Sequence, residues 1–245
     1  MSTRPQRNGG AAPRDRPDVI VLEDVVKQYP NGTRALQDVS LTIPQGDFVF
    51  LVGPSGAGKS TIIRLLIRAE APTAGRIEVD GSDVARLRRS QVPYLRRKVG
   101  VVFQDFKLLP AKTVYENVAF ALQVTGHPDD EVRERTDQAL ELVGLEKRKK
   151  HYPDQLSGGE QQRTAIARAL VGQPPIVVAD EPTGNLDPVT SWEIIQLLSR
   201  INELGTTLVM ATHNQEIVNA MRKRVVALEH GAIVRDQAGG AYQHA

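Results

Sequence analysis

The segment that most restricts the fold of this chain is residues 53–60, which read GPSGAGKS. It fits the pattern G-x-x-x-x-G-K-[ST] and lies between an apolar run, residues 48–52, and a run with helical spacing of apolar side chains, residues 62–66. Glycines at such a strand-to-helix turn let successive backbone N–H groups point at one anion, and the helix dipole adds positive potential. The segment therefore predicts a phosphate-binding loop in an α/β fold.

Each residue of this loop has an expected task. Lys59 should reach the β and γ phosphates of a nucleotide, and Ser60 should ligate magnesium. The alternative, a glycine-rich turn that happens to precede Lys-Ser, is weaker because a strand and a helix flank it. The residues expected to contact the nucleotide are Gly53, Pro54, Ser55, Gly56, Ala57, Gly58, Lys59, Ser60 and Thr61.

Residues 176–181, IVVADE, read as a buried parallel strand that ends in two carboxylates. Asp180 can hold the magnesium shell from the strand tip, and Glu181 can polarise the attacking water. Two acids at a strand end could also be simple turn residues. The phosphate-binding loop elsewhere in the chain favours the catalytic interpretation.

Two further polar residues follow predicted strands. Gln104 comes after residues 99–103, and His213 comes after residues 208–212, where open α/β sheets place their ligands. Gln104 could contact magnesium or the water, and His213 could donate to the γ-phosphate. Alone, each would be read as an ordinary loop residue.

The order of predicted elements is strands first, and then strand and helix in alternation. Thr113 and Glu116 have capping-box spacing at the start of one helix, and a second helix is expected at about residues 130–143. A helix is also expected at residues 157–170, and a closing hairpin at residues 225–234. We therefore predict an α/β core with a helical subdomain at about residues 104–170.

Residues 156–161, LSGGEQ, open the helix at residues 157–170. Ser157 and Glu160 again have capping-box spacing, which explains the segment as a helix cap. Two adjacent glycines at a helix N-terminus also expose amides to an anion. The spacing alone leaves both interpretations open.

Taken in order, seven features resemble the nucleotide-binding subunits of ATP-binding cassette (ABC) proteins over about residues 19–236. They are Tyr29, GPSGAGKST, Gln104, LSGGEQ, VVADE, GNLD and His213. The combination of LSGGEQ after a phosphate-binding loop and before Asp-Glu is very specific. The resemblance implies a P-loop NTPase core with an antiparallel β subdomain and an α-helical subdomain.

The resemblance also implies how ATP and Mg²⁺ would be held. Tyr29 would stack on adenine, Gln104 would sense the γ-phosphate, and Glu181 and His213 would drive hydrolysis. Two copies of the chain would sandwich two ATP molecules, and Asp187 would lie in the loop that communicates across the interface. The residues that would contact the ATP bound by the other copy are Ser157, Gly158, Gly159 and Glu160.

Within the family, three stretches look most like ATPases that act in cell division with a separate integral membrane protein, at the cytoplasmic face of the plasma membrane. They are FVFLVGPSGAGKST, PYLRRKVGVVFQDFKLLPAKTVYENVAFAL and LSGGEQQRTAIARAL. Two departures are a long N-terminal tail and Asn214, where an acid is common. Alternatives are the ATPase of a lipoprotein-releasing or export transporter and a soluble P-loop phosphotransferase, although the latter has no use for LSGGEQ.

Charge and composition limit the partners. The net charge of +2 resides in residues 1–18, which carry four Arg against two Asp, so the rest of the chain is balanced at 27 against 27. We therefore expect no nucleic-acid partner. Cys-type metal sites and disulfides are excluded because the chain has no cysteine. No apolar stretch approaches the roughly 18 residues that span a bilayer, so membrane contact is expected through a partner.

The ends and one internal stretch complete the predictions. Residues 1–18 are expected to form a disordered basic tail, residues 19–236 the ABC ATPase domain, and residues 237–245 a short C-terminal tail. Residues 86–98 hold six basic residues in thirteen. They are either a solvated face or a contact with anionic lipid or with acidic groups of the membrane partner. Phe106, Leu108 and Leu109 are expected in the core or, if exposed, at a docking patch for a partner helix.

Overall fold

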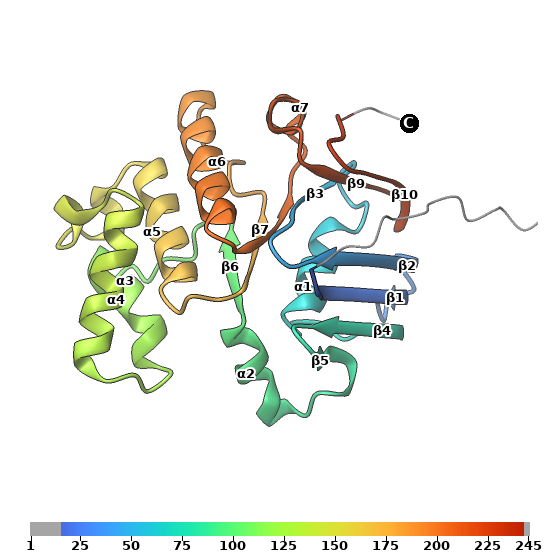
Figure 1. Ribbon diagram of the computed structural model, residues 1–245, viewed down its shortest axis with the longest axis horizontal. Coiled ribbons are helices and arrows are strands. Elements are labelled where there is room, and N and C mark those ends of the chain that lie inside the picture. Colours follow the sequence, from blue (N-terminus) through green and yellow to red (C-terminus); the bar gives the residue numbers. More distant parts are fainter. Residues whose placement is uncertain (1–15, 243–245) are drawn as a thin grey trace, which may run out of the picture.

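A six-stranded sheet forms the centre of the computed structural model, which describes residues 16–242. Its strand order is β10-β9-β3-β8-β7-β6, and all neighbours are parallel except β10, which pairs antiparallel with β9. The strands are β3 (Phe48–Val52), β6 (Val99–Phe103), β7 (Ile176–Asp180), β8 (Thr207–Ala211), β9 (Arg224–Glu229) and β10 (Ala232–Gln237). Figure 1 shows this sheet between the helical part of the molecule and a second sheet.

Strand β3 explains why both faces of the central sheet are covered. All five of its residues are buried, and successive side chains of a strand point to opposite faces. Phe48 and Phe50 pack into one apolar cluster with α5 and α6. Val49 and Leu51 pack into a second cluster with α1 and the other sheet. The phosphate-binding loop therefore starts from a strand that is held on both sides.

The second sheet is antiparallel and has the order β2-β1-β4-β5. Its strands are β1 (Asp18–Gln28), β2 (Arg34–Pro44), β4 (Ala74–Val79) and β5 (Ser82–Asp83). Helix α1 (Lys59–Leu66) shares an apolar cluster with this sheet and with β3. The loop before α1 is consequently held by a helix that packs against both sheets.

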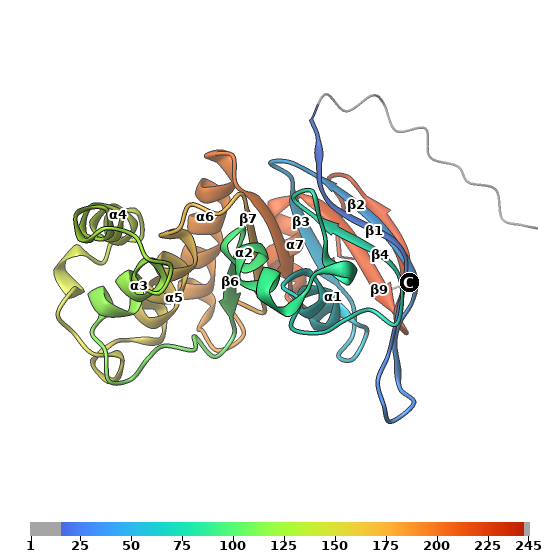
Figure 2. The same cartoon turned by 90° about the horizontal axis from the view of Figure 1, so that it is seen from below.

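Three helices form a separate layer at the other end of the molecule (Figures 1 and 2). They are α3 (Val114–Gln123), α4 (Asp129–Leu142) and α5 (Gly158–Leu170). The predicted capping boxes at Thr113 and Ser157 are confirmed, because each hydroxyl accepts the amide of the residue three positions later while that residue's carboxylate accepts the cap amide. Both helices therefore begin where the sequence predicted.

The remaining α-helices within residues 16–242 are α6 (Pro188–Glu203), α7 (Gln215–Met221) and α2 (Val92–Arg97). Neither α2 nor α7 was predicted. Helix α2 has six residues, of which only Leu95 is buried, and α7 has seven, of which only Ile217 and Val218 are buried, so both offer almost no apolar period to detect. Within residues 16–242, no helix combines the length and apolarity needed to cross a bilayer.

Both tails are shorter than predicted, because residues next to the domain are ordered parts of it. Residues 1–15 lie outside the described residues, but β1 already begins at Asp18 and Arg16 pairs with Asp47 at 2.8 Å. At the other end, Gln237 belongs to β10. The amide of Tyr242 donates to the Asn219 side chain, and its ring packs against the core. The ordered domain is therefore longer at both ends than the apolar pattern indicated.

Candidate nucleotide-binding site

Four neighbouring parallel strands bring the predicted site residues together at their carboxyl ends. In the sheet order β3-β8-β7-β6, these ends are followed by the phosphate-binding loop, His213, Glu181 and Gln104. They border one cavity of about 570 Å³, whose lining residues are Ser55, Gly56, Gly58, Lys59, Ser60, Thr61, Gln104, Glu181 and His213. Open α/β sheets bind ligands at this edge, so the arrangement fits a nucleotide phosphate site.

The loop needs glycine at two positions for different steric reasons. Gly53 has φ 141°, and a Cβ there would lie 2.1 Å from the Leu228 carbonyl oxygen. Gly58 has φ 107°, and its Cβ would lie 2.7 Å from the carbonyl oxygen of Ala35. The loop therefore packs backbone against backbone of β9 and β2, which side chains at these positions would prevent.

Lys59 has no carboxylate partner in the described part of the chain. Its side chain is buried, and Nζ donates to the carbonyl oxygens of Gly53 at 2.8 Å and of Pro54 at 3.1 Å. Both acceptors belong to the loop itself. A buried ammonium held only by neutral carbonyls is ready to receive an anion in the same cradle.

Ser60 and Asp180 are joined across the floor of the site. The Ser60 hydroxyl donates to Oδ1 of Asp180 at 2.8 Å, across 120 positions of sequence. Burial raises the pKa of Asp180, and the hydrogen bond from Ser60 opposes this shift. Ser60, Gln104, Asp180 and Glu181 also line a neighbouring cavity of about 490 Å³. Two oxygen donors therefore meet where the sequence predicted a metal.

Glu181 occupies a strained position just after β7. Its φ is +50°, in the left-handed region, and its amide donates to the Ala211 carbonyl of β8 at 3.0 Å. This conformation turns the carboxylate toward His213, whose Nδ1 lies 2.8 Å from Oε2. The Glu181 side chain is 16% exposed and that of His213 is 68% exposed, so the histidine is the part that is freer to move.

Gln104 is tied to the loop that follows Glu181. Its Nε2 atom donates to Oδ1 of Asn185 at 3.3 Å, and Nδ2 of Asn185 donates back to the Gln104 carbonyl at 3.0 Å. A Cβ on Gly184 would lie 2.8 Å from the Gln104 amide nitrogen. The side chain of Gln104 is thus positioned by the segment that also carries Asp187.

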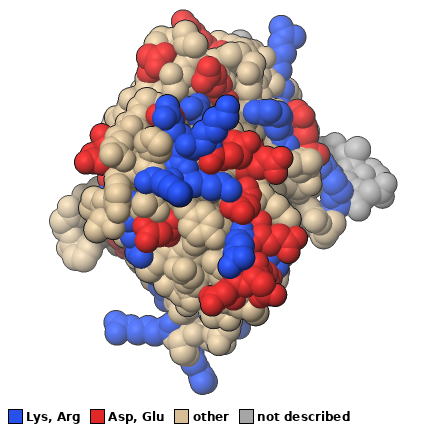
Figure 3. Space-filling view, turned by 90° about the vertical axis from the view of Figure 1, so that its left-hand side faces the viewer, with Lys and Arg blue, Asp and Glu red and all other residues tan. Residues whose placement is uncertain are grey.

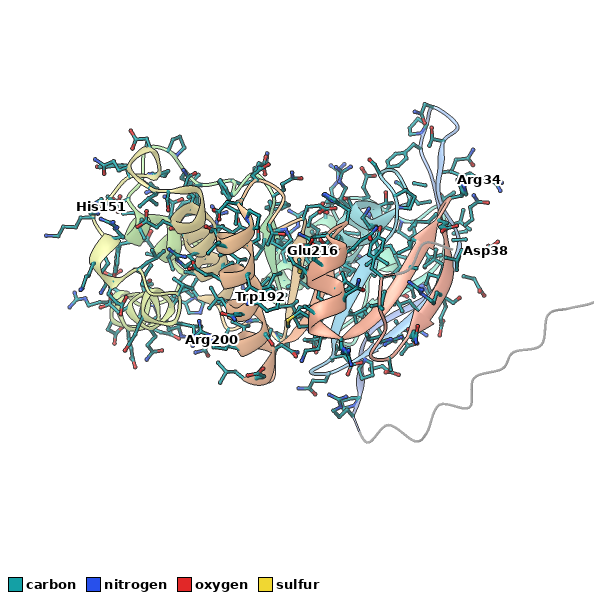
Figure 4. All side chains as sticks on the ribbon, turned by 90° about the horizontal axis from the view of Figure 1, so that it is seen from above. Arg34, Asp38, His151, Trp192, Arg200 and Glu216 are labelled. Atoms are coloured by element: carbon teal, nitrogen blue, oxygen red, sulfur yellow. The ribbon has the colours of Figure 1, made fainter. Side chains whose placement is uncertain are left out.

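A second cavity of about 500 Å³ adjoins the first through Glu181 and His213. It lies between α6 and α7, and its lining includes Trp192 and Glu216, which Figure 4 labels on these two helices. Glu181 and His213 therefore lie between two cavities, one beside the phosphate-binding loop and one beside α6.

Comparison with known proteins agrees with this geometry. Residues 36–184 match the family model described as ABC transporter. The cell division ATP-binding protein FtsE of Bacillus subtilis is 56% identical over 91% of this chain and 98% of its own length. FtsE of Mycobacterium tuberculosis is 54% identical over 91% and 98%. The dimeric ATP-binding cassette MJ0796, in a post-hydrolysis state bound to ADP and Pi, is 38% identical with a TM-score of 0.82 and covers 91% of this chain and 100% of its own.

The chain belongs to the ABC transporter family and, within it, to the FtsE group. It is an ATPase with the P-loop ABC fold, as the sequence predicted. The structural neighbour and the FtsE relatives match nearly their whole lengths, so the resemblance extends over the complete cassette.

In this ABC ATPase the residues of LSGGEQ do not border the nucleotide cavity of their own chain. Ser157 and Glu160 cap α5, and Glu160 also accepts from Nε of Arg148 at 2.7 Å. A Cβ on Gly159 would lie 2.5 Å from Cγ2 of Thr190, on the first turn of α6. The glycines thus allow α5 to approach α6 closely, which gives this segment a structural task besides any contact with a nucleotide.

Tyr29 and Asp187 also lie outside the cavity lining. Tyr29 is in the turn between β1 and β2, and Nζ of Lys27 lies 4.9 Å from its ring centroid. Asp187 caps α6 by accepting the amides of Val189 and Thr190 at 3.0 Å. Hydrogen bonds from the Thr190 side chain and amide hold the pKa of Asp187 below its usual range. Their predicted roles toward adenine and the second copy remain predictions.

Three residues that position the site were missed. Gln162, fully buried in α5, donates from Nε2 to the Pro182 carbonyl at 2.7 Å, next to Glu181. Asn117, fully buried in α3, bonds both the amide and the carbonyl of Leu109 and so holds the segment after Gln104. The available signal was a polar side chain on the apolar face of a predicted helix. The third residue, Arg168 of α5, donates from its guanidinium to the carbonyls of Phe106 at 2.8 Å and Lys107 at 2.6 Å, in the turn after Gln104.

Phe106, Leu108 and Leu109 are half-buried, so neither predicted environment fits them fully. Phe106 and Lys107 both adopt left-handed backbone conformations, with φ 58° and 50°. A strained turn therefore lies directly after Gln104, and the apolar pattern of this segment did not indicate it.

Proposed function

We propose that this ATPase drives an FtsX-type integral membrane protein in cell division, as a pair of copies that share ATP at the cytoplasmic face of the plasma membrane. The observation that carries the proposal is the assembled set of Lys59, Ser60, Gln104, Glu181 and His213 in one cavity. The relatives named FtsE supply the process, because they match this chain over 91% of its length.

The phosphate-binding loop supplies the affinity for ATP. Its amides and the N-terminus of α1 face the phosphates, and Lys59 exchanges the carbonyls of Gly53 and Pro54 for phosphate oxygens. Phosphoryl transfer is catalysed mainly by positioning and by charge stabilisation. The loop therefore contributes both binding and part of the catalysis.

The oxygens of Ser60 and Asp180 fit a Mg²⁺ site. Mg²⁺ prefers oxygen ligands and is usually held by one or two carboxylates together with substrate phosphates. Ser60, Asp180 and Gln104 would hold the ion, which supplies charge neutralisation at the β- and γ-phosphates when it is bound.

Glu181 is the residue placed to orient and deprotonate the attacking water. Its carboxylate is near the loop, and His213 fixes it at 2.8 Å. When ATP is bound, the exposed His213 side chain can turn to donate to the γ-phosphate, and this movement releases the carboxylate for the water. Gln104 would contact the γ-phosphate, so its binding would shift the segment that follows β6.

The second copy is needed because one chain does not complete the site. Ser157, Gly158, Gly159 and Glu160 do not line the nucleotide cavity of their own chain, yet their helix N-terminus suits an anion. In a two-fold pair, this segment of each copy faces the phosphates held by the other, with Asp187 at the contact. The dimeric state of the cassette MJ0796 bound to ADP and Pi supports this arrangement.

A groove of about 710 Å³ beside Gln104 is where the membrane partner would dock. It is lined by residues of α2, β6, α3 and α5, including Phe103 and Leu122. The lining residues Phe103 and Lys107 flank Gln104 in sequence. A helix bound in the groove would therefore be displaced when the turn that contains Gln104 moves. The basic residues Arg96 and Arg97 of the predicted partner or lipid contact belong to this groove.

One experiment tests the proposed function. The purified chain is combined with the FtsX-type protein from the same source in nanodiscs, and free phosphate is measured with MgATP as the only substrate. We expect hydrolysis without any acceptor and its stimulation by the membrane protein. Transfer of phosphate to a small acceptor, or failure of the two proteins to associate, would contradict the proposal.

A further inference from the structure

The stretch of residues 84–104 carries six basic residues and no Asp or Glu. In the structure it includes a 3-10 turn at Arg89–Gln91, followed by α2 and β6. Figure 1 shows α2 and the loop before it at the lower edge of the molecule, and Figure 3 shows Lys or Arg side chains projecting from the lower end. The stretch therefore contributes charge of only one sign to this edge.

The chain itself compensates three of these six cations. Arg86 pairs with Asp83 at 3.5 Å, and Lys98 pairs with Asp80 at 2.9 Å. Nε of Arg96 donates to a main-chain carbonyl of the segment after α1 at 3.1 Å. These three side chains are therefore accounted for by the fold.

Arg88, Arg89 and Arg97 are the cations that the chain leaves uncompensated. All three are exposed, and none has a carboxylate within ion-pair distance among residues 16–242. Tyr94 lies between them in sequence and, at 63%, is the most exposed aromatic side chain of that part of the chain. The Arg97 guanidinium lies 5.0 Å from the centre of its ring. An aromatic ring with a polar tip is thus exposed among three cations.

These four side chains lie on a part of the surface that protrudes. Within residues 88–97 only Leu95 is buried. Arg88, Arg89 and Tyr94 do not line the groove of α2, β6, α3 and α5, whereas Arg97 does. The four side chains therefore adjoin the place assigned above to the membrane partner, but most of them lie outside that hollow.

We propose that this surface, formed by Arg88, Arg89, Tyr94 and Arg97, contacts the anionic lipid headgroups of the cytoplasmic leaflet beside the membrane partner. The proposal rests on the proposed function, which brings α2 to the membrane protein. The charges are complementary, because acidic lipids give this leaflet a negative surface potential. Headgroups form a broad plane that several protruding cations can reach together, and a tyrosine ring suits such an interface with its apolar body and polar hydroxyl.

The expected strength of this contact defines its task. A cation near an anionic bilayer raises membrane affinity by about five-fold, the equivalent of about 1 kcal/mol. Three such cations are too few for stable anchoring, which takes a second signal, and the membrane partner supplies that signal. The lipid contact would fix the orientation of α2, and of β6 directly after it, relative to the bilayer.

Sedimentation with partner-free vesicles tests the lipid contact by itself. The full-length chain should bind vesicles that contain phosphatidylglycerol and not vesicles of phosphatidylcholine alone, and binding should fall as salt is added. Arg88→Gln combined with Arg89→Gln should lower the partition coefficient by about 30-fold, since two cations are removed. Tyr94→Ala should weaken binding at low and high salt alike, because its ring makes an uncharged contact.

Lys147→Gln combined with Lys150→Gln is the matched control. Both lysines are exposed in the segment between α4 and α5, and neither has a carboxylate within ion-pair distance among the described residues. This double variant removes the same amount of charge, yet it should bind vesicles like the wild type. Each variant should keep wild-type ATP hydrolysis in solution, which shows that it folds.

A second measurement places the surface at the bilayer in the assembled complex. Because the chain has no cysteine, Ser90→Cys and Lys147→Cys each accept a single fluorophore. The labelled chains are bound to the FtsX-type protein in nanodiscs that contain phosphatidylglycerol and a lipid with a nitroxide on its headgroup. The label at residue 90 should be quenched strongly and the label at residue 147 weakly.

The outcomes separate this inference from the proposed function. If the wild type binds and is stimulated by the membrane protein while the label at residue 90 is quenched no more than that at residue 147, the inference is wrong and the proposed function stands. Equal vesicle binding by the two double variants would also overturn the inference. If the wild type neither associates with the membrane protein nor responds to it, the proposed function fails, and the vesicle experiment still decides whether this surface binds lipid.

Discussion

The Nδ1 atom of His213 lies 2.8 Å from Oε2 of Glu181, and this contact joins the ends of two neighbouring strands, β8 and β7. The carboxylate is shielded and the imidazole is exposed, so the pair has one fixed member and one movable member. A base held by a movable partner can be released by a ligand that competes for that partner. The γ-phosphate of ATP is the ligand with the required charge.

Replacing Glu181 tests its assignment as the base. Glu181→Gln should bind MgATP with nearly unchanged affinity in calorimetry and lower phosphate release by about 10²–10⁴-fold, the usual contribution of general-base catalysis. Glu216→Gln alters a carboxylate of the adjacent cavity and should retain turnover. Wild-type turnover in Glu181→Gln would refute the assignment.

Lys59→Ala tests the phosphate-binding loop. The variant loses charge-assisted hydrogen bonds worth about 1.5–3 kcal/mol, so MgATP affinity should fall by about 10–100-fold. Titration calorimetry measures the loss, and ADP should be affected less than ATP because Lys59 is expected at the β and γ phosphates. Unchanged affinity for ATP would contradict this function of the loop.

Two glycine substitutions should separate steric conflict from backbone strain. Gly53→Ala places a Cβ 2.1 Å from the Leu228 carbonyl oxygen, so the free energy of unfolding should fall by about 3 kcal/mol or more. Gly56, with φ 80° and open space around it, should lose only about 1–2 kcal/mol on change to Ala. Urea unfolding measures both, and equal losses would show that the close contact with β9 is unimportant.

Glu160 should contribute a pH-dependent part of stability. The amide of Ser157, with Arg148, lowers its pKa below the ordinary 4.5. A lowered pKa in the folded state stabilises the protein above pH 4.5, and this contribution disappears as the pH falls through the folded value. Glu160→Gln should therefore lower the free energy of unfolding by about 0.5–1 kcal/mol at pH 7 and by less at pH 3, where more of the wild-type carboxylate is protonated.

The control for Glu160 is Glu141→Gln on α4, an exposed glutamate whose side chain makes no hydrogen bond or ion pair with the rest of residues 16–242. Its unfolding free energy should follow the wild type at both pH values. A loss in Glu160→Gln that is as large at pH 3 as at pH 7 would show that the packing of the side chain, and not its charge, supports the start of α5.

The sequence was sufficient wherever one motif combined chemistry with local structure. Residues 53–60 identified the loop, its strand and its helix together, and β6 and β8 ended where Gln104 and His213 were expected to follow a strand. The capping boxes at Thr113 and Ser157 were equally informative, since Ser or Thr and Glu three positions apart satisfy each other's amides. These features depend on neighbours in sequence.

Features that depend on distant parts of the chain could not be predicted. The ion pair of Arg16 with Asp47 extends the domain beyond an apparently polar tail, and nothing near Arg16 reveals Asp47. The same holds for Gln162, whose amide reaches Pro182 from another helix, and for Arg168, whose guanidinium reaches the turn after Gln104. Each is a polar side chain whose acceptor is defined only by tertiary packing.

Intermolecular cross-linking tests the central claim, that two copies complete each other's ATP sites. The natural chain has no cysteine, so Ser55→Cys in one copy and Ser157→Cys in the other, both with Glu181→Gln, give a clean background. With the membrane partner present, we predict a disulfide between the two copies that requires MgATP and is absent when Ser90→Cys replaces Ser157→Cys. No MgATP-dependent cross-link, or an equal yield with Ser90→Cys, would contradict the account.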